Sequence, residues 1–282
     1  MKKRILSVLA LVLACAMALS ACGGNNGGQQ SGGNNNPAST PAGGGSAPAD
    51  DGTVYKLSIA RNLPESDPAC IGDAEFARLL EEKSGGRFDV TLYLNSSVIA
   101  NDTEALEKVA DGTIQFTSTT AATCASYAQI PELNVFNEPM MFETEDEIWT
   151  LAESDYMKDF YQKFQDATGV IISPKGFSMG WYGVGTVKQD ITDMGALKGL
   201  KLRVANVPQQ LSMVEAMGAA PTSINWNEIF TTLQQGTVDG ILLTSGLLYN
   251  NGFYETLSYY KNTRICSCYH MFIVNAEWYN SL

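Results

Sequence analysis

Residues 199–243 read GLKLRVANVPQQLSMVEAMGAAPTSINWNEIFTTLQQGTVDGILL, and this stretch decides the class of fold. Alternating apolar side chains predict a strand at 200–204, and a short apolar run predicts a buried strand at 238–243. Between them, 209–217 and 227–235 have the apolar spacing of helices, and each is followed by a glycine. A strand, two helices and another strand predict an α/β fold whose sheets are mostly parallel.

The same alternation extends towards the N-terminus and shows no internal repeat. Strands are expected at 54–59, 88–94 and 114–118 and from 170 onwards, and helices at 71–84, from Asp102 or Thr103 to 112, and at 148–168. The folded part of the chain is therefore expected to begin near Thr53.

The first 22 residues have the features of an export signal. A basic start at 2–4 precedes an apolar run at 5–19 that is short for a membrane span. The following Leu-Ser-Ala-Cys, 19–22, resembles a bacterial lipobox, in which the cysteine carries the lipid. We expect residues 1–21 to be a signal peptide and Cys22 to be the lipid attachment site. The alternative is an ordinary signal peptide with an accidental cysteine.

Residues 22–52 have the composition of a tether. Between 23 and 50 the chain consists of Gly, Asn, Gln, Ser, Pro, Ala and Thr with a single charge, Asp50. Such a segment has too little apolar surface to pack, so a flexible coil is expected. A lipid followed by a coil and a folded part predicts an extracytoplasmic protein anchored to the cell membrane.

Composition excludes several classes of function. The 282 residues carry a net charge of -12, and removal of residues 1–21 would make the chain more acidic still. General nucleic-acid binding relies on the neutralisation of phosphates by basic groups, so no nucleic-acid partner is expected. The chain contains one histidine and six cysteines, too few for a multi-histidine metal site or a disulfide-built scaffold, and we expect no metal and no cofactor.

Five short segments in a fixed order resemble those of a known family. They are GRFDV at 86–90, ADGTI at 110–114, GLKLRV at 199–204, MGAAPT at 217–222 and LQQGTVDG at 233–240. In this order they are similar to the solute-binding proteins of tripartite ATP-independent periplasmic (TRAP) transporters, of the DctP type that binds C4-dicarboxylates. The resemblance covers essentially all of 54–282.

This resemblance implies a two-domain periplasmic-binding-protein-like fold with a ligand cleft between discontinuous domains. Domain I is expected to comprise 53–179 and 268–282, and domain II 180–267. The implied function is capture of a small organic acid by hinge closure and its delivery to TRAP membrane permease subunits, without enzymatic turnover. Family chains usually continue past Leu282, so we expect this sequence to be truncated at its C-terminus.

Arg203 is the strongest candidate for ligand binding. It follows the strand residues Leu200–Leu202, and a guanidinium can grip a carboxylate through two parallel hydrogen bonds. The resemblance implies that Arg203 is the clamp for the ligand carboxylate. The alternative is an arginine paired with an acidic residue inside the fold.

Several neighbours are candidates for the rest of the site. The resemblance implies that an aromatic residue at Trp226 packs on the ligand, although a core position is nearly as compatible with the sequence. Asn206 and Asn225 either bind ligand oxygens or cap turns. On domain I the candidates follow strands or precede a helix, where α/β sheets bind ligands. They are Asn62, Asn101 and Thr120, while Arg61 is expected to be a solvated surface residue rather than a second cation of the cleft.

Departures from the family pattern affect the expected ligand. Many family members have a second arginine where this chain has Trp181, Tyr182 and Gly183, and polar residues where it has the apolar stretch that ends at Leu243. We therefore include Trp181, Tyr182 and Leu243 in the site. Because each charge of a desolvated dicarboxylate must be paired, one arginine predicts a monocarboxylate with an apolar or aromatic body.

The remaining cysteines and the histidine are expected to be structural. Cys266 and Cys268 would share one face of a strand, where they could hold a soft metal but more often act as small buried side chains. We expect His270 to be a satisfied strand residue rather than a ligand-binding one. The sequence does not assign disulfide partners to Cys70 or Cys124.

Two other functions remain open. The same fold could serve an ATP-driven importer or a sensor, which neighbouring genes would reveal. A secreted enzyme is the third alternative, but we identify no nucleophile elbow and no His-x-x-x-His pair, and one histidine leaves little room for a catalytic triad.

Overall fold

The computed structural model describes residues 52–282, so the expected signal peptide, Cys22 and most of the tether lie outside the described residues. Within 52–282, no helix is long and apolar enough to cross a membrane.

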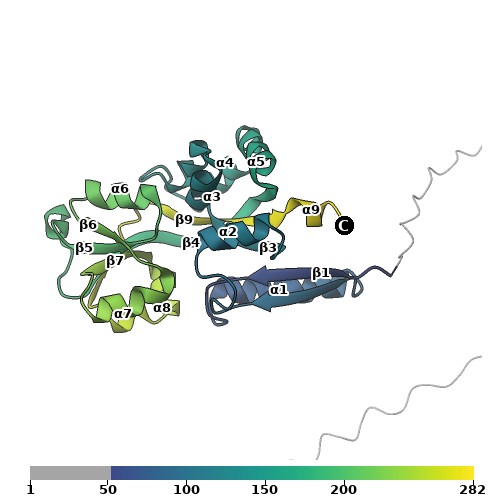
Figure 1. The fold of residues 1–282 in the computed structure, drawn as a ribbon. Coiled ribbons are helices and arrows are strands. Elements are labelled where there is room, and N and C mark those ends of the chain that lie inside the picture. The colour runs from purple at the N-terminus through teal and green to yellow at the C-terminus, as the bar shows by residue number, and fades with distance from the viewer. Residues whose placement is uncertain (1–51) are drawn as a thin grey trace, which may run out of the picture. The chain divides into compact units, whose positions relative to one another are not determined.

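The described strands form one sheet in the order β2-β1-β3-β9-β4-β7-β5-β6, with β8 paired to β4 (Figure 1). Parallel pairing joins β1 to β2 and β3, and β5 to β6 and β7, whereas β9 and β4 run antiparallel to their neighbours. The strands are β1 Tyr55–Ala60, β2 Phe88–Tyr93, β3 Phe116–Thr120, β4 Val170–Thr186, β5 Lys201–Val204, β6 Ala220–Ser223, β7 Gly240–Thr244, β8 Tyr259–Lys261 and β9 Ser267–Asn275. The expected α/β class is confirmed, but the expectation of mostly parallel sheets is wrong, because two parallel blocks are joined by antiparallel strands in the middle.

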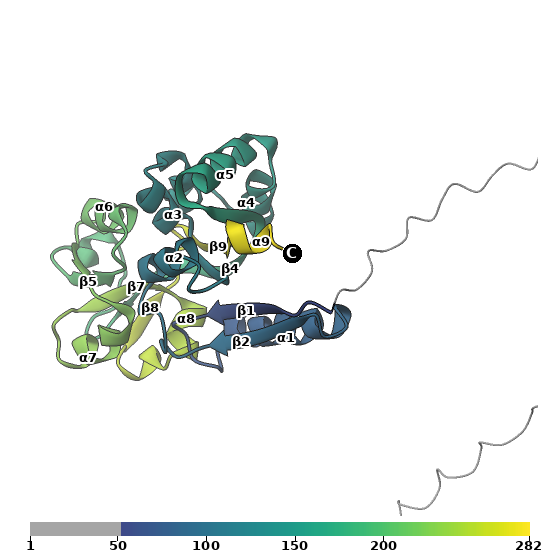
Figure 2. The ribbon, with the colours of Figure 1, turned by 45° about the vertical axis from the view of Figure 1, so that its right-hand side comes forward.

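Helices cover the two parallel blocks. Figures 1 and 2 both show α6 on one side of β5 and β7 and α7 on the other. The α-helices are α1 Pro68–Lys83, α2 Asp102–Ala110, α3 Ala121–Ala128, α4 Glu145–Ala152, α5 Asp155–Thr168, α6 Pro208–Ala216, α7 Ile229–Gln234, α8 Ser245–Asn250 and α9 Ala276–Tyr279. Short 3-10 helices lie at Pro131–Asn137, Met194–Leu197, Trp226–Glu228 and Phe253–Glu255.

Two sequence-based boundaries were wrong, and both for the same reason. The single helix expected at 148–168 is two helices, because the Ser154 side chain accepts a hydrogen bond from the Met157 amide and starts α5 there. The helix expected to be capped by Asp102 or Thr103 is capped instead by Asn101, whose side chain accepts from the Glu104 amide. In both cases a side chain that accepts a hydrogen bond from a main-chain N–H determines the residue at which the helix begins.

The long strand β4 joins two hydrophobic cores. It pairs with β9 as far as Trp181 and with β7 from Tyr182 onwards. One core contains Ala60, Leu106, Phe136, Ile148, Phe164, Ile172 and Ile273, and the other contains Val184, Leu202, Val204, Ile229, Leu233, Ile241 and Leu242. The domain boundaries at 179–180 and 267–268 stay a prediction.

The expected ligand residues lie near the carboxyl ends of strands from both parallel blocks. Asn62 follows β1, Thr120 ends β3, and Leu243 is the penultimate residue of β7. Arg203 is the penultimate residue of β5. In α/β sheets this edge is where ligands bind, since loops and helix starts meet there.

Candidate functional site

A cavity of about 400 Å³ brings together all the predicted ligand residues except Trp181. Its lining includes Asn62, Asn101, Thr120, Tyr182, Arg203, Asn206, Asn225, Trp226 and Leu243. These residues come from seven stretches of chain, and their convergence defines the candidate site.

Arg203 is buried, with 5% of its surface exposed, and has no ion pair among residues 52–282. Its Nε and Nη2 donate to the main-chain oxygen of Ile224 at 3.0 and 2.9 Å, and its Cζ lies 5.9 Å from the centre of the Trp226 ring. Burial lowers the pKa of Arg203 to about 10, although Tyr182 and Asp102 oppose the change. A buried guanidinium without an anion is costly, so this geometry favours an anionic ligand over the alternative of an internal acidic partner.

Tyr182 is held in the cavity wall by Gln210. The Gln210 amide nitrogen donates to the Tyr182 hydroxyl at 3.1 Å, and its oxygen accepts from the Ala205 amide at 3.0 Å. Burial raises the pKa of Tyr182 well above its ordinary value, so the hydroxyl stays neutral and can donate a hydrogen bond.

Trp181 does not line the cavity, which corrects the expectation from sequence. Adjacent residues of a strand point to opposite faces, so the inward direction of Tyr182 turns Trp181 away. Its ring packs against the domain I core, and the Arg264 guanidinium lies 4.7 Å from its centre.

Gly183 leaves no room for a side chain. A Cβ at this position would lie 2.5 Å from the main-chain oxygen of Lys261 and 2.5 Å from the Tyr260 hydroxyl. Any side chain at Gly183 would require β8 to move, so the packing of β4 against β8 excludes an arginine at this position.

Arg61 is neither solvated nor part of this cavity, so the expectation for it was wrong. It is 4% exposed and forms a two-pronged ion pair with Asp73 of α1, with Nε–Oδ2 at 2.5 Å and Nη2–Oδ1 at 2.9 Å. Its remaining nitrogen, Nη1, donates to Ser118 Oγ. Each nitrogen of the guanidinium has a protein partner and Asp73 balances its charge, so Arg61 does not offer a second unpaired cation to a ligand.

Two of the polar candidates on domain I already have structural roles. Asn101 caps α2, which leaves its side-chain NH₂ free to donate. Thr120 caps α3, and its hydroxyl also lies 2.9 Å from that of Thr123. Asn225 precedes the 3-10 helix Trp226–Glu228 without capping it, so its side chain remains available.

Sequence reasoning missed Asp102 and His270, which both line the cavity. Asp102 is the first residue of α2, and burial raises its pKa to about 6, opposed by the Thr120 backbone and the charges of Arg61 and Arg203. The sequence did indicate Asp102 as a candidate, because it is an acidic residue at the expected start of a helix and follows the candidate Asn101. His270 lies on strand β9, as expected, and in addition it borders the cavity.

The family of the chain follows from a comparison with known families. Residues 59–282 match the model of the bacterial extracellular solute-binding proteins, family 7, also called DctP. The chain belongs to this family. Family 7 consists of solute-binding proteins, which bind ligands rather than transform them.

Curated relatives in family 7 are longer than this chain. A solute-binding protein of Chromohalobacter salexigens is 24% identical over 225 residues, which cover 76% of this chain and 63% of the relative. The C4-dicarboxylate-binding protein DctB of Bacillus subtilis is 25% identical over 213 residues, 74% of this chain and 58% of DctB. The chain thus spans less than two thirds of either relative.

Solved structures of family 7 share the two-domain fold. The sugar acid binding protein DctPAm of Advenella mimigardefordensis, in complex with galactonate, superposes with a TM-score of 0.76 at 24% identity, over 82% of this chain and 73% of that one. A TRAP periplasmic solute binding protein of Shewanella oneidensis with bound succinate gives a TM-score of 0.74 at 21% identity, with the same coverage.

The described residues hold a larger cavity of about 610 Å³, but its chemistry does not favour it as the acid site. Its walls are mainly apolar, with Phe76, Phe116, Phe177 and Phe272 among them, and its one arginine is the paired Arg61. The cavity around Arg203 has the unpaired cation and the polar groups, so we regard it as the ligand site of this family 7 chain.

The four described cysteines are buried and free. Burial raises the pKa of Cys70, Cys266 and Cys268, so these thiols stay protonated and unreactive at neutral pH. Within residues 52–282 no cluster of His, Cys, Asp or Glu could hold a metal ion.

Proposed function

We propose that this chain is the extracytoplasmic solute-binding subunit of a TRAP-type secondary transporter, which captures a small organic acid and delivers it to the membrane permease. The observation that carries the proposal is the buried guanidinium of Arg203, which faces a cavity and lacks an acidic partner within 52–282. A carboxylate would supply the missing charge and accept the free N–H groups.

Capture by hinge closure is supported by the composition of the cavity wall. Arg203 and Trp226 come from one parallel block of the sheet, and Asn62 and Thr120 from the other. A ligand that contacts both blocks stabilises the closed arrangement in which all the contacts are made. The signal peptide and the lipid on Cys22, which would hold the protein at the outer membrane face, are part of the same proposal.

The ligand we propose is a monocarboxylate. Arg203 is the only cationic side chain in the cavity lining, since Arg61 is engaged by Asp73. Acidic side chains also line it, namely Asp102, Glu104 and Glu107. A second carboxylate on the ligand would be desolvated without a cation and would face these acids.

Thermal melting with a panel of acids tests the proposal. The panel contains D-galactonate and D-glucuronate as monocarboxylates and succinate as the dicarboxylate, and it is applied to wild type, Arg203→Ala and the surface control Arg78→Ala. A ligand at a hundredfold excess over its Kd adds about 2.7 kcal/mol to stability, which a melt detects. We expect a monocarboxylate to stabilise wild type and Arg78→Ala but not Arg203→Ala.

Two results would contradict the proposal in different ways. Equal stabilisation of wild type and Arg203→Ala would remove the arginine from the site. Stabilisation by succinate alone would retain the transport function but replace the monocarboxylate with a dicarboxylate.

A further inference from the structure

His270 is the only histidine in the chain, and it lies in the wall of the ligand cavity. It is on β9, directly across the antiparallel ladder from Thr120 of β3. Its ring packs against Phe177, with the ring centres 5.4 Å apart. The imidazole is thus held on one side by an aromatic ring and borders the cavity on another.

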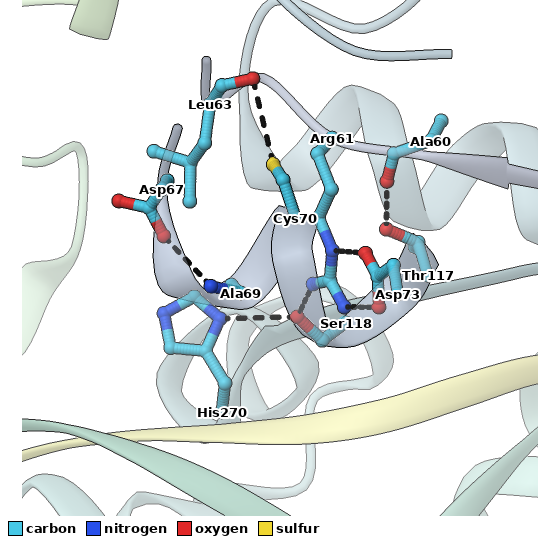
Figure 3. Close-up of polar contacts among 10 residues, drawn as sticks. All are labelled: Ala60, Arg61, Leu63, Asp67, Ala69, Cys70, Asp73, Thr117, Ser118 and His270. Carbon is cyan, nitrogen blue, oxygen red and sulfur yellow. Dashed lines mark hydrogen bonds and ion pairs between the residues drawn. The ribbon is translucent and has the colours of Figure 1, made fainter. Parts of the chain in front are cut away.

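A chain of polar contacts leads from His270 into the protein (Figure 3). Nδ1 of His270 is 3.4 Å from Ser118 Oγ, and the same oxygen accepts from Nη1 of Arg61. Arg61 in turn is fixed by both oxygens of Asp73. Ser118, Arg61 and Asp73 are all buried, so solvent does not compete for these contacts.

This arrangement determines where the imidazole proton lies. A guanidinium nitrogen can only donate, so Ser118 Oγ is the acceptor in its contact with Arg61. Among residues 52–282 the one other polar contact of this hydroxyl is Nδ1 of His270, at 3.4 Å, and we assign Nδ1 as the acceptor because this direction gives the hydroxyl hydrogen a partner. A neutral ring with an accepting Nδ1 carries its proton on Nε2.

Nε2 has no protein partner within the described residues. Figure 3 shows this nitrogen on the side of the ring away from Ser118. Because His270 borders the ligand cavity, the Nε2–H group is a donor available to a bound ligand.

The surrounding charges keep the ring neutral. Arg61 is the cation nearest to the Nδ1 side, and burial and the Arg61 charge together lower the pKa of His270 to about 3. Asp73 is held by Arg61, Cys268 of the same strand is a protonated thiol, and the carboxyl groups on the cavity side are those of Asp102, Glu104 and Glu107. The ring therefore does not become a cation at any pH at which the protein works.

We propose that His270 is a specificity-determining residue of the ligand site, an Nε2–H donor oriented by Ser118, Arg61 and Asp73, which selects acids that carry an uncharged oxygen. This inference rests on the proposed function, since it assumes that the acid binds in this cavity. An imidazolium would attract a second carboxylate, whereas a neutral N–H pairs with a hydroxyl or carbonyl oxygen without requiring charge.

Asp102 complements this donor. The Asp102 carboxyl has a hydrogen bond with the Thr120 backbone, which opposes the rise of its pKa. Thr120 is the residue opposite His270 in the ladder, so Asp102 and His270 both adjoin Thr120. A donor and an acceptor on neighbouring positions match a hydroxyl group, which can accept from His270 and donate to Asp102. The arrangement thus favours a hydroxylated acid, bound by Arg203 at its carboxylate and by His270 at a hydroxyl, in place of the apolar or aromatic body expected from the sequence.

NMR of the imidazole tests the proton assignment without a ligand. The full chain, labelled with ¹⁵N-histidine and purified without a histidine tag, gives signals from one imidazole only. We expect Nε2 protonated, Nδ1 unprotonated and no titration between pH 8 and pH 5, against an ordinary pKa of 6.5. In Ser118→Ala the Nδ1 acceptor loses its donor, and both tautomers should be seen. A protonated Nδ1 in wild type, or titration near pH 6.5, would overturn the proposal.

Binding measurements test the role in selection. D-galactonate carries hydroxyl groups and succinate carries none, and each is titrated into wild type, His270→Phe and Arg203→Ala. His270→Phe keeps an aromatic ring against Phe177 but removes the donor, so affinity for D-galactonate should fall about tenfold.

The two variants separate the two proposals. If Arg203→Ala abolishes binding of D-galactonate and His270→Phe leaves it unchanged, the role of His270 is refuted and the proposed function stands. If Arg203→Ala leaves binding unchanged, the proposed function itself is refuted.

Discussion

Arg203 and Ile224 are joined by two hydrogen bonds, because Nε and Nη2 of the guanidinium both donate to the main-chain oxygen of Ile224, at 3.0 and 2.9 Å. The contact fixes the plane of the guanidinium and leaves Nη1 and one hydrogen of Nη2 for a ligand. Trp226 lies two residues beyond Ile224, so the same loop orients the cation and places an aromatic ring beside it.

Replacement of Arg203 by lysine should therefore abolish tight binding even though the positive charge remains. An ammonium cannot bond Ile224 and grip a carboxylate in two parallel hydrogen bonds at once, and we expect at least a tenfold loss of affinity. Titration calorimetry with the acid that stabilises wild type measures this.

The matched control is Arg264→Lys. Arg264 also stacks on a tryptophan, Trp181, but lies outside the cavity, so its replacement should leave the affinity unchanged. Full affinity in Arg203→Lys would show that Arg203 contributes charge alone.

Gly183→Ala should destabilise the protein. The added Cβ would lie 2.5 Å from the Lys261 oxygen, a backbone atom that can move only with β8. Overpacking of this kind costs about 1–3 kcal/mol, which urea unfolding at neutral pH detects.

Gly72→Ala is the contrasting variant. Gly72 lies within α1, and a Cβ there meets nothing within 4 Å. Removal of a helical glycine should stabilise the protein by about 0.5–1 kcal/mol. Equal effects of the two substitutions would contradict the close approach of β8 to β4.

Ser154→Ala should lower the free energy of unfolding by about 1 kcal/mol, because it removes the N-cap of α5. The measurement is again urea unfolding, and helix content from circular dichroism should change little. Ser66→Ala, at an exposed position before α1 that is not its N-cap, is the control and should have no effect. No loss of stability in Ser154→Ala would mean that α4 and α5 are separated by packing rather than by the cap.

The contrast between Ser154 and Arg203 shows what local sequence can predict. Apolar periodicity predicted most elements, since it depends on neighbours in sequence. Strand ends indicated Thr120, whereas the roles of Arg203 and Trp226 were implied by the resemblance to the family. The break at Ser154 was missed because the apolar spacing continues across it. Strand pairing across β9 and β4 was also missed, since it joins segments about a hundred residues apart.

Long-range partners explain the other errors. Arg61 was expected in solvent. Its contact to Ser118 joins residues that are 57 positions apart, and the local sequence pattern does not predict such a contact. His270 was expected to be a satisfied strand residue, and its position beside the cavity was not predicted because it depends on contacts such as that to Ser118, 152 residues away. Such side-chain networks are determined by topology, which composition and periodicity do not specify.

Asp102 predicts a pH dependence of stability with a definite sign. Its pKa is raised from 3.8 to about 6, so between these values the folded state binds more protons than the unfolded state. The free energy of unfolding therefore falls as pH rises from about 4 to about 6 and remains lower above pH 6. Asp102→Asn lacks this titration, so at pH 7–8 it should be more stable than wild type, by about 3 kcal/mol, with the difference vanishing near pH 4.

Urea unfolding of both proteins from pH 4 to pH 8 measures this difference. Asp67, whose pKa burial also raises, is present in both proteins and cancels in the comparison. Asp111→Asn is the control of opposite sign, because the hydrogen bonds of Asp111 to Thr113 lower its pKa, so this variant should lose stability relative to wild type as pH rises. A difference between wild type and Asp102→Asn that does not change with pH would show that the Asp102 carboxyl is solvated and does not face the Arg203 cavity.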